Sequence, residues 1–121
     1  MNEITRDLLQ FLNDSPSCYH AAHQVAQRLL AAGYERLWEQ EKWALQEGGR
    51  YFVLRGDASL LAFRVPRRDF RGFMLSASHS DSPTYKVREN AEVVSAGNCL
   101  RLSVEPYGGM IHRSWLDRPL S

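Results

Sequence analysis

The sequence predicts an α/β fold in which two N-terminal helices are followed by a mixed β-sheet. Two observations support this fold class. Apolar residues recur at helical spacing over the first 33 residues, and residues typical of β-strands are concentrated in short segments after residue 50. With 121 residues, 44% of them hydrophobic, the chain is long enough for one compact domain with a core.

The first helix is expected over about residues 3–13. Its apolar positions repeat every three or four residues, which places them on one face: Ile4, Leu8, Leu9, Phe11 and Leu12. The polar run Asn13-Asp14-Ser15-Pro16 then ends this helix and begins another.

The second helix is expected to begin with Ser15 as N-cap and Pro16 at the first helical position. Gly33 is expected to end it as the residue that follows the C-cap. The apolar face consists of Tyr19, Ala22, Val25, Ala26, Leu29 and Leu30. His20 and His23 have a spacing that can chelate a metal, but no third ligand accompanies them, and a packing or surface role is favoured.

Residues 34–50 are expected to form a connector in which Trp38 and Trp43 cover the edge of the core. The strands expected after it are Tyr51–Arg55, Ser59–Val65, Phe73–Ser78, Tyr85–Arg88 and Asn98–Glu105. Gly56-Asp57-Ala58 separates the first two and predicts a hairpin. The third is apolar or small at nearly every position, which is typical of a strand covered on both faces.

The composition excludes several classes of function. A net charge of +1 gives no reason to expect nucleic acid or a membrane surface as a partner. The basic run from Arg64 to Arg71 also contains Asp69 and is better explained as a solvated loop. Cys18 and Cys99 belong to no metal or redox motif and predict two reduced thiols in a cytosolic protein. We find no secretion signal and no apolar run of membrane-spanning length.

The segment Met74–Pro83 carries the strongest functional signal. Its apolar and small residues stop at His79, and Asp81 follows two positions later. In extended backbone, residues two apart point to the same side. A neutral imidazole can therefore bind zinc while the carboxylate orients the ring. Taken alone, these two residues favour a capped strand end without any metal, and the rest of the chain raises the weight of the metal site.

Other candidate sites are weaker. His112 follows Gly108-Gly109, and either an active-site loop or a structural turn explains it, the turn being favoured. A serine hydrolase is excluded because Ser78 and His79 point to opposite faces of a strand and no Gly-x-Ser-x-Gly elbow is present. The glycine pair also lacks the pattern of a phosphate-binding loop.

Several segments, in order, resemble the M18 family of metallo-aminopeptidases, the aspartyl aminopeptidase group. They are Phe11–Ser17 with Tyr19–Ala21, Leu29–Tyr34, Glu41–Trp43, Tyr51–Val53, Ser78–Pro83, and Val104–Gly109 with Ser114–Arg118. The resemblance covers nearly the whole chain. It implies a cytosolic enzyme that removes N-terminal residues, possibly acidic ones, from peptides.

The resemblance also implies two divalent metals per complete site, usually zinc, with cobalt or manganese as alternatives, and assembly into homo-oligomeric dodecamers. His79 matches the family's first metal ligand, and Asp81 matches the aspartate that orients the site. The fold implied is the N-terminal part of a zinc-peptidase catalytic sandwich, with residues 1–121 ending near the start of an inserted domain.

The chain departs from the family in length. Residues 110–121 look like a chain cut in mid-fold, and the family's remaining ligands and general base lie further downstream. Neither Glu105 nor Asp117 matches a family role. We therefore expect an incomplete, inactive fragment. The alternative is a non-catalytic binding or assembly module that kept the same half-fold.

Overall fold

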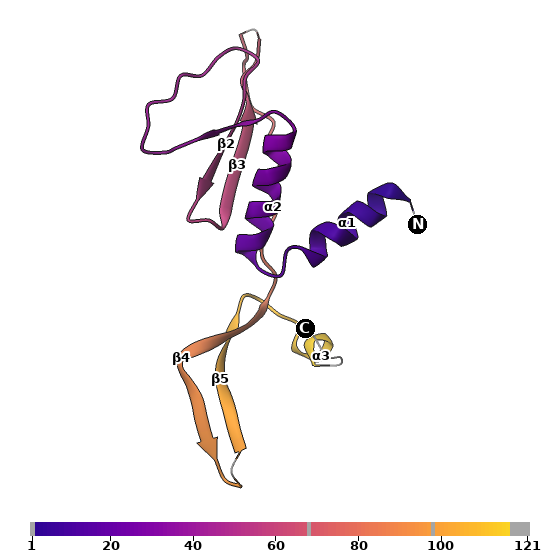
Figure 1. Cartoon of the computed structure of the whole chain (residues 1–121), viewed down its shortest axis with the longest axis vertical. Coiled ribbons are helices and arrows are strands. Elements are labelled where there is room, and N and C mark those ends of the chain that lie inside the picture. Colours follow the sequence, from indigo (N-terminus) through magenta and orange to yellow (C-terminus); the bar gives the residue numbers. More distant parts are fainter. Residues whose placement is uncertain (1, 68, 98, 117–121) are drawn as a thin grey trace. The chain divides into compact units, whose positions relative to one another are not determined.

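The computed structural model describes residues 2–67, 69–97 and 99–116 (Figure 1). The chain divides into two compact units, residues 1–81 and 82–121, here called the N-terminal and C-terminal units. The elements in order are α1 (Glu3–Asn13), α2 (Cys18–Ala31), β1 (Glu35–Leu37), β2 (Arg50–Arg55), β3 (Ser59–Arg64), β4 (Thr84–Ser95), β5 (Cys99–Tyr107) and α3 (His112–Trp115). None of the helices in these ranges has the length and apolar character of a membrane span.

Both predicted helices are present, and side chains or turns complete their ends. The side chain of Asn2 caps α1 by accepting from the amide of Thr5 at 2.8 Å. Gly33, at a φ of 79°, ends α2 as predicted. Its amide donates to the carbonyl of Leu30, and the amide of Tyr34 donates to that of Leu29, which is the Schellman arrangement.

The predicted start of the second helix is wrong by two residues. The N-cap of α2 is Ser17, whose hydroxyl accepts from the amide of His20 at 3.5 Å. Ser15 precedes Pro16, which biases its backbone toward extended conformations. The Ser15 hydroxyl oxygen is buried and has no hydrogen-bond partner within the described ranges.

The N-terminal unit contains a mixed sheet with strand order β1-β2-β3. β1 pairs with β2 in parallel, and β2 pairs with β3 in antiparallel register, from Arg50 opposite Arg64 to Arg55 opposite Ser59. The predicted hairpin and the α/β fold class are confirmed. β1 was not predicted, because three residues within a connector carry too little periodicity to indicate a strand.

The core of this unit lies on both sides of β2. On one side Leu37, Tyr51 and Val53 form a buried cluster, against which Phe63 and Val65 pack. Alternation along the strand puts Phe52, which is fully buried, on the other side. Helix α2 lies beside the sheet in Figure 1, and its small residues Ala22 and Ala26 are buried.

The predicted strand Phe73–Ser78 is wrong. In the described residues this segment forms no strand and pairs with none. Its side chains are open to solvent, with exposed fractions of 80% for Phe73, 102% for Met74 and 86% for Leu75. A strand covered on both faces needs a neighbouring strand for its backbone hydrogen bonds and other elements packed against its two faces. The described residues provide no such strand and no such packing for this segment.

The C-terminal unit contains an antiparallel hairpin of β4 and β5. β4 is longer than the predicted Tyr85–Arg88, because an irregularity in register between Val87 and Glu92 lets pairing continue beyond it. The predicted strand that begins at Asn98 corresponds to β5, although Asn98 itself lies outside the described residues, as do Asp117 and Arg118.

One face of the hairpin is mostly apolar, with Glu92 opposite Leu102 as its charged member. Cross-strand partners share a face, so Val87 with Val104 and Val94 with Leu100 lie on the same side. These side chains remain exposed, with fractions of 83% for Val94 and 62% for Leu100.

Candidate metal site

The predicted pair His79 and Asp81 lies together in the N-terminal unit. The Nδ1 atom of His79 is 3.2 Å from the Oδ1 atom of Asp81. The backbone bends at Ser80 between them instead of continuing as an extended strand. The His79 side chain is 92% exposed, whereas that of Asp81 is 32% exposed. The carboxylate is therefore partly sheltered and the imidazole faces solvent.

This contact gives the two ring nitrogens different roles. When Nδ1–H of the neutral ring donates a hydrogen bond to the carboxylate, Nε2 keeps its lone pair for another partner. Zinc-binding histidines commonly pair their second nitrogen with a carboxylate, which fixes the tautomer and the orientation of the ring. The donor set therefore fits one histidine ligand of a zinc site together with its orienting acid.

A complete ligand set is not present in the parts of the chain that the structure describes. No group of three or more His, Cys, Asp or Glu side chains within those parts could hold a metal ion. Structural zinc is usually bound by four protein ligands and catalytic zinc by three. Of such a set, the described residues could supply His79 as one ligand.

Two of the other histidines that the sequence singled out, His20 and His112, have partners of their own. Nδ1 of His20 lies 2.8 Å from the hydroxyl of Ser17, at the start of α2. Nδ1 of His112 lies 3.3 Å from the hydroxyl of Tyr85 within the C-terminal unit. His112 begins the short helix α3, so the structure places it at a helix start that follows the glycine pair. Neither histidine shares a cluster of metal-binding side chains in the described ranges.

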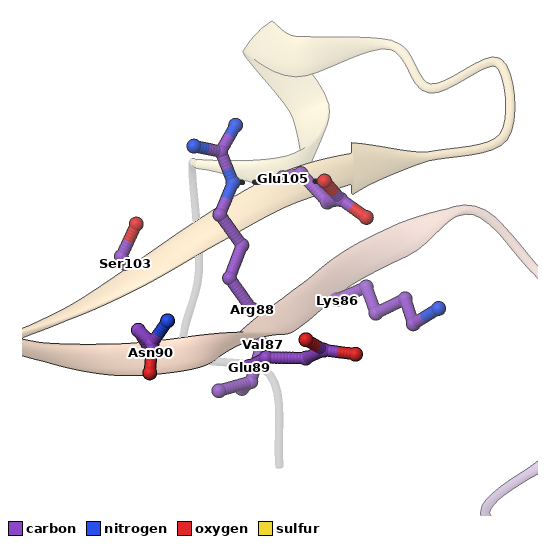
Figure 2. A pocket seen from close by; sticks show the side chains of 7 residues that line it. All are labelled: Lys86, Val87, Arg88, Glu89, Asn90, Ser103 and Glu105. Atoms are coloured by element: carbon purple, nitrogen blue, oxygen red, sulfur yellow. Dashed lines mark ion pairs between the residues drawn. The ribbon is translucent and has the colours of Figure 1, made fainter.

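A hollow of about 540 Å³ lies over the irregular part of β4 in the C-terminal unit (Figure 2). It is lined by Lys86, Val87, Arg88, Glu89, Asn90, Ser103 and Glu105. Nε of Arg88 lies 3.5 Å from a carboxylate oxygen of Glu105. The charges of the lining are balanced and exposed, so the hollow favours no particular ionic ligand.

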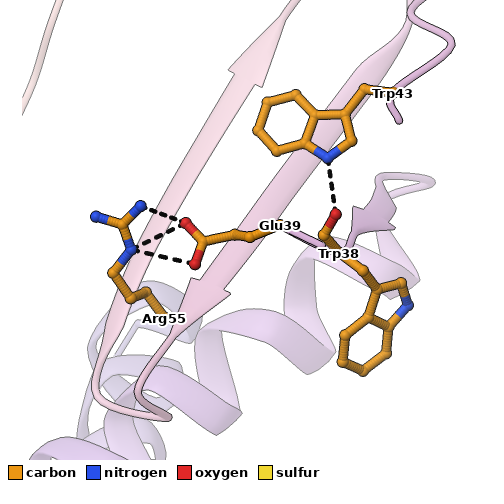
Figure 3. Close-up of polar contacts among 4 residues, drawn as sticks. All are labelled: Trp38, Glu39, Trp43 and Arg55. Atoms are coloured by element: carbon orange, nitrogen blue, oxygen red, sulfur yellow. Dashed lines mark hydrogen bonds and ion pairs between the residues drawn. The ribbon is translucent and has the colours of Figure 1, made fainter. Parts of the chain in front are cut away.

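The connector before β2 is fixed by polar contacts that the sequence did not predict (Figure 3). The indole nitrogen of Trp43 donates to the carbonyl of Trp38 at 2.9 Å. The Arg55 guanidinium donates to both carboxylate oxygens of Glu39, at 2.9 and 3.2 Å from its Nε. These hydrogen bonds hold the pKa of Glu39 below its ordinary value of 4.5. Trp43 also lies 6.3 Å from Phe63 between ring centroids, consistent with the predicted cover at the core edge.

A serine between the two predicted site residues was also missed. The hydroxyl of Ser80 donates to the backbone carbonyl of Ala58 at 3.0 Å. The partners are 22 positions apart, and no sequence pattern indicates a side-chain bond to one particular carbonyl at that distance.

The chain is similar in sequence to one family of metalloproteases. Residues 11–121 match the family described as aminopeptidase I zinc metalloprotease (M18). A probable M18 family aminopeptidase 2 from Pseudomonas aeruginosa is 46% identical over 121 residues, which cover 98% of this chain and 28% of that protein. The chain thus spans little more than a quarter of such a relative.

Solved structures show the same similarity. The mApe1 structure of Chaetomium thermophilum matches with a TM-score of 0.84 and 30% identity, over 94% of this chain and 26% of that one. The S. cerevisiae mApe1 dodecamer matches with a TM-score of 0.77 and 27% identity, over 96% of this chain and 28% of that one.

Proposed function

The chain belongs to the M18 family of zinc metalloproteases, and we propose from this that it is the N-terminal part of an aminopeptidase that releases N-terminal residues from peptides. The single observation that carries the proposal is the contact between His79 and Asp81, which lies in a segment that the family match includes. Substrates with an acidic N-terminal residue are the first to test, because the resemblance is to the aspartyl aminopeptidase group.

In this proposal His79 provides one metal ligand through Nε2. Asp81 acts in catalysis by holding the ring at Nδ1, so that the lone pair of Nε2 points away from the carboxylate. Zinc, when bound, would lower the pKa of a bound water to about 7 and would act as a Lewis acid that polarises the peptide carbonyl. We propose two zinc ions in the complete site, with cobalt or manganese as possible substitutes.

The remaining ligands and the general base belong, in this proposal, to residues beyond 121. The relatives are longer than this chain, which spans 28% of a probable aminopeptidase of the family. The described residues supply one ligand, so residues 1–121 alone are proposed to be inactive. We assign them to the N-terminal segment of the catalytic domain, ending near the start of an inserted domain. We further propose a cytoplasmic homo-oligomer, following the dodecamer of a similar structure.

A binding or assembly module is the second candidate. The exposed apolar face of the β4–β5 hairpin favours it, because two-stranded hairpins alone are marginally stable and apolar faces of this kind commonly contact other protein surfaces. Mixing the purified chain with a complete M18 enzyme and measuring mass by light scattering separates the two candidates. A heteromeric complex that forms without any change in turnover would favour the module.

The test of the proposed function is His79→Ala in the full-length protein. We expect the variant to lose one zinc per subunit, measured by elemental analysis, and most of its activity on N-terminal aspartyl peptides. His23→Ala is the matched control, because His23 is an exposed residue of helix α2 and the same side chain is removed there. Full zinc content and normal turnover in His79→Ala would show that His79 is not a ligand.

A further inference from the structure

Ser80 connects the proposed site to the sheet of the N-terminal unit. It occupies the bend between His79 and Asp81, and its hydroxyl donates to the carbonyl of Ala58 at 3.0 Å. Its two neighbours in the sequence, His79 and Asp81, contact each other across this bend.

The acceptor belongs to a well-defined turn. Ala58 follows Gly56 and Asp57, which have φ values of 57° and 55°, in the left-handed region. The turn closes the hairpin between Arg55 and Ser59, the last pair of a register that is continuous along β2 and β3. A carbonyl in such a turn has a fixed position, so a hydrogen bond to it fixes the donor as well.

The segment before Ser80 has no comparable support. Among the described residues, those numbered 70–79 belong to no strand and are exposed to solvent. The helices and strands of the N-terminal unit are held by strand pairing or helix packing. The Ser80 hydroxyl therefore replaces strand pairing as the contact that anchors the end of this segment.

We infer that Ser80 is a positioning residue, whose hydrogen bond to Ala58 sets the bend that brings the Nδ1 atom of His79 to the carboxylate of Asp81. A role for Ser80 in catalysis rests on the proposed function, whereas its role in the bend rests on the two hydrogen-bond contacts alone. Loss of the hydroxyl should loosen the contact between His79 and Asp81 and leave the fold intact.

The first experiment uses the metal-free chain at pH 8. The ¹⁵N chemical shifts of the His79 ring report which nitrogen carries the proton. We expect the wild type to be mainly protonated at Nδ1, facing Asp81, and Ser80→Ala to shift toward protonation at Nε2. Ser80→Thr keeps a hydroxyl and should restore the wild-type shifts. Ser78→Ala removes the same group from a nearby exposed serine and should change nothing.

The second experiment measures zinc affinity by chelator competition in the full-length protein. One hydrogen bond corresponds to about a 2- to 10-fold change in an equilibrium constant. We expect zinc to bind Ser80→Ala about 2- to 10-fold more weakly than the wild type, and Ser80→Thr to bind normally. A purely structural role would lower the melting temperature without this rescue pattern in the ring shifts.

The outcomes separate the two proposals. Unchanged ring shifts in Ser80→Ala, or a change that Ser80→Thr does not reverse, would overturn the positioning role even if His79→Ala loses its zinc. Ring shifts that change in Ser80→Ala and return to the wild-type values in Ser80→Thr support the positioning role. If His79→Ala meanwhile keeps its zinc, the proposed function fails while the role of Ser80 in the bend stands.

Discussion

Asp81 contributes to the proposed site through one oxygen atom that lies 3.2 Å from the ring of His79. Asp81→Asn keeps an acceptor of similar shape but removes the negative charge that faces Nδ1 of the ring. Replacing such a partner of a zinc-binding histidine typically costs 10- to 100-fold in affinity or activity. We expect a loss of about that size in the full-length protein, measured by zinc competition and by turnover, with the melting temperature unchanged.

Asp57→Asn is the control for this prediction. Asp57 has a φ of 55°, a conformation that asparagine adopts readily, and it lies in the same unit. The control should bind zinc normally. Wild-type affinity and turnover in Asp81→Asn would reject the role assigned to Asp81.

The ion pair between Arg55 and Glu39 makes stability depend on pH. Hydrogen bonds from Arg55 lower the pKa of Glu39 in the folded state. A carboxylate with a lowered folded pKa contributes stability that is present above its unfolded pKa and is lost as the pH falls through the folded value. We therefore expect Glu39→Gln to melt below the wild type at neutral pH, and the difference to shrink as the pH falls from about 6 to about 3.

The measurement is thermal unfolding followed by circular dichroism at several pH values. Glu41→Gln serves as control, because the Glu41 carboxylate forms no ion pair with other described residues. Its melting curve should follow the wild type throughout. A difference between Glu39→Gln and wild type that stayed constant with pH would contradict the assignment.

At the level of elements, the C-terminal end of α2 depends on one glycine. Gly33 has a φ of 79°, and a Cβ atom there would meet nothing within 4 Å. The cost of Gly33→Ala is therefore conformational and not steric, and we expect it to lower the free energy of unfolding by about 1 kcal/mol. Urea unfolding followed by tryptophan fluorescence measures this change.

Gly72 provides the comparison. Its φ lies outside the left-handed region, and a Cβ atom at this position would also meet nothing within 4 Å. Gly72→Ala should leave the free energy of unfolding within about 0.5 kcal/mol of the wild type. Equal effects at the two positions would contradict the capping role of Gly33.

The sequence predicted the elements that form through contacts between residues close together in the chain. The apolar periodicity of α1 and the glycine after α2 indicated the helices, and Gly56-Asp57-Ala58 indicated the β2–β3 hairpin. The prediction of Ser15 as N-cap was wrong because Ser17, on the other side of Pro16, can equally accept from a helical amide. Local signals do not distinguish the two serines.

Elements that depend on distant partners were harder to predict. β1 is a strand because all three of its residues pair with residues of β2, which follow more than ten positions later in the sequence. Residues 73–78 have the composition of a buried strand, yet a strand forms only where a neighbour supplies its hydrogen bonds. The same reasoning applies to the candidate site. The pair His79 and Asp81 was visible as a local motif, whereas the bond between Ser80 and Ala58 required the fold.

At the level of the whole molecule, the chain length limits what the candidate site can do. One histidine with its orienting acid binds zinc far more weakly than a complete set of three or four ligands. We therefore expect the polypeptide of residues 1–121 to release no residues from aspartyl peptides, under conditions where the full-length protein is proposed to release them. Zinc titration calorimetry of both forms, together with product release measured by chromatography, tests this expectation. Measurable turnover by the 121 residues alone would show that the site needs nothing further.

The exposed segment around Phe73 also affects the susceptibility of the polypeptide of residues 1–121 to proteolysis. Digestive and housekeeping proteases bind their substrates in extended form, and chymotrypsin cuts after large apolar residues. Phe73, Met74 and Leu75 offer such residues in unpaired backbone that is open to solvent. A cut there would leave the three-stranded sheet on one fragment and His79 on the other, so a single scission would separate the proposed ligand from the turn that anchors it.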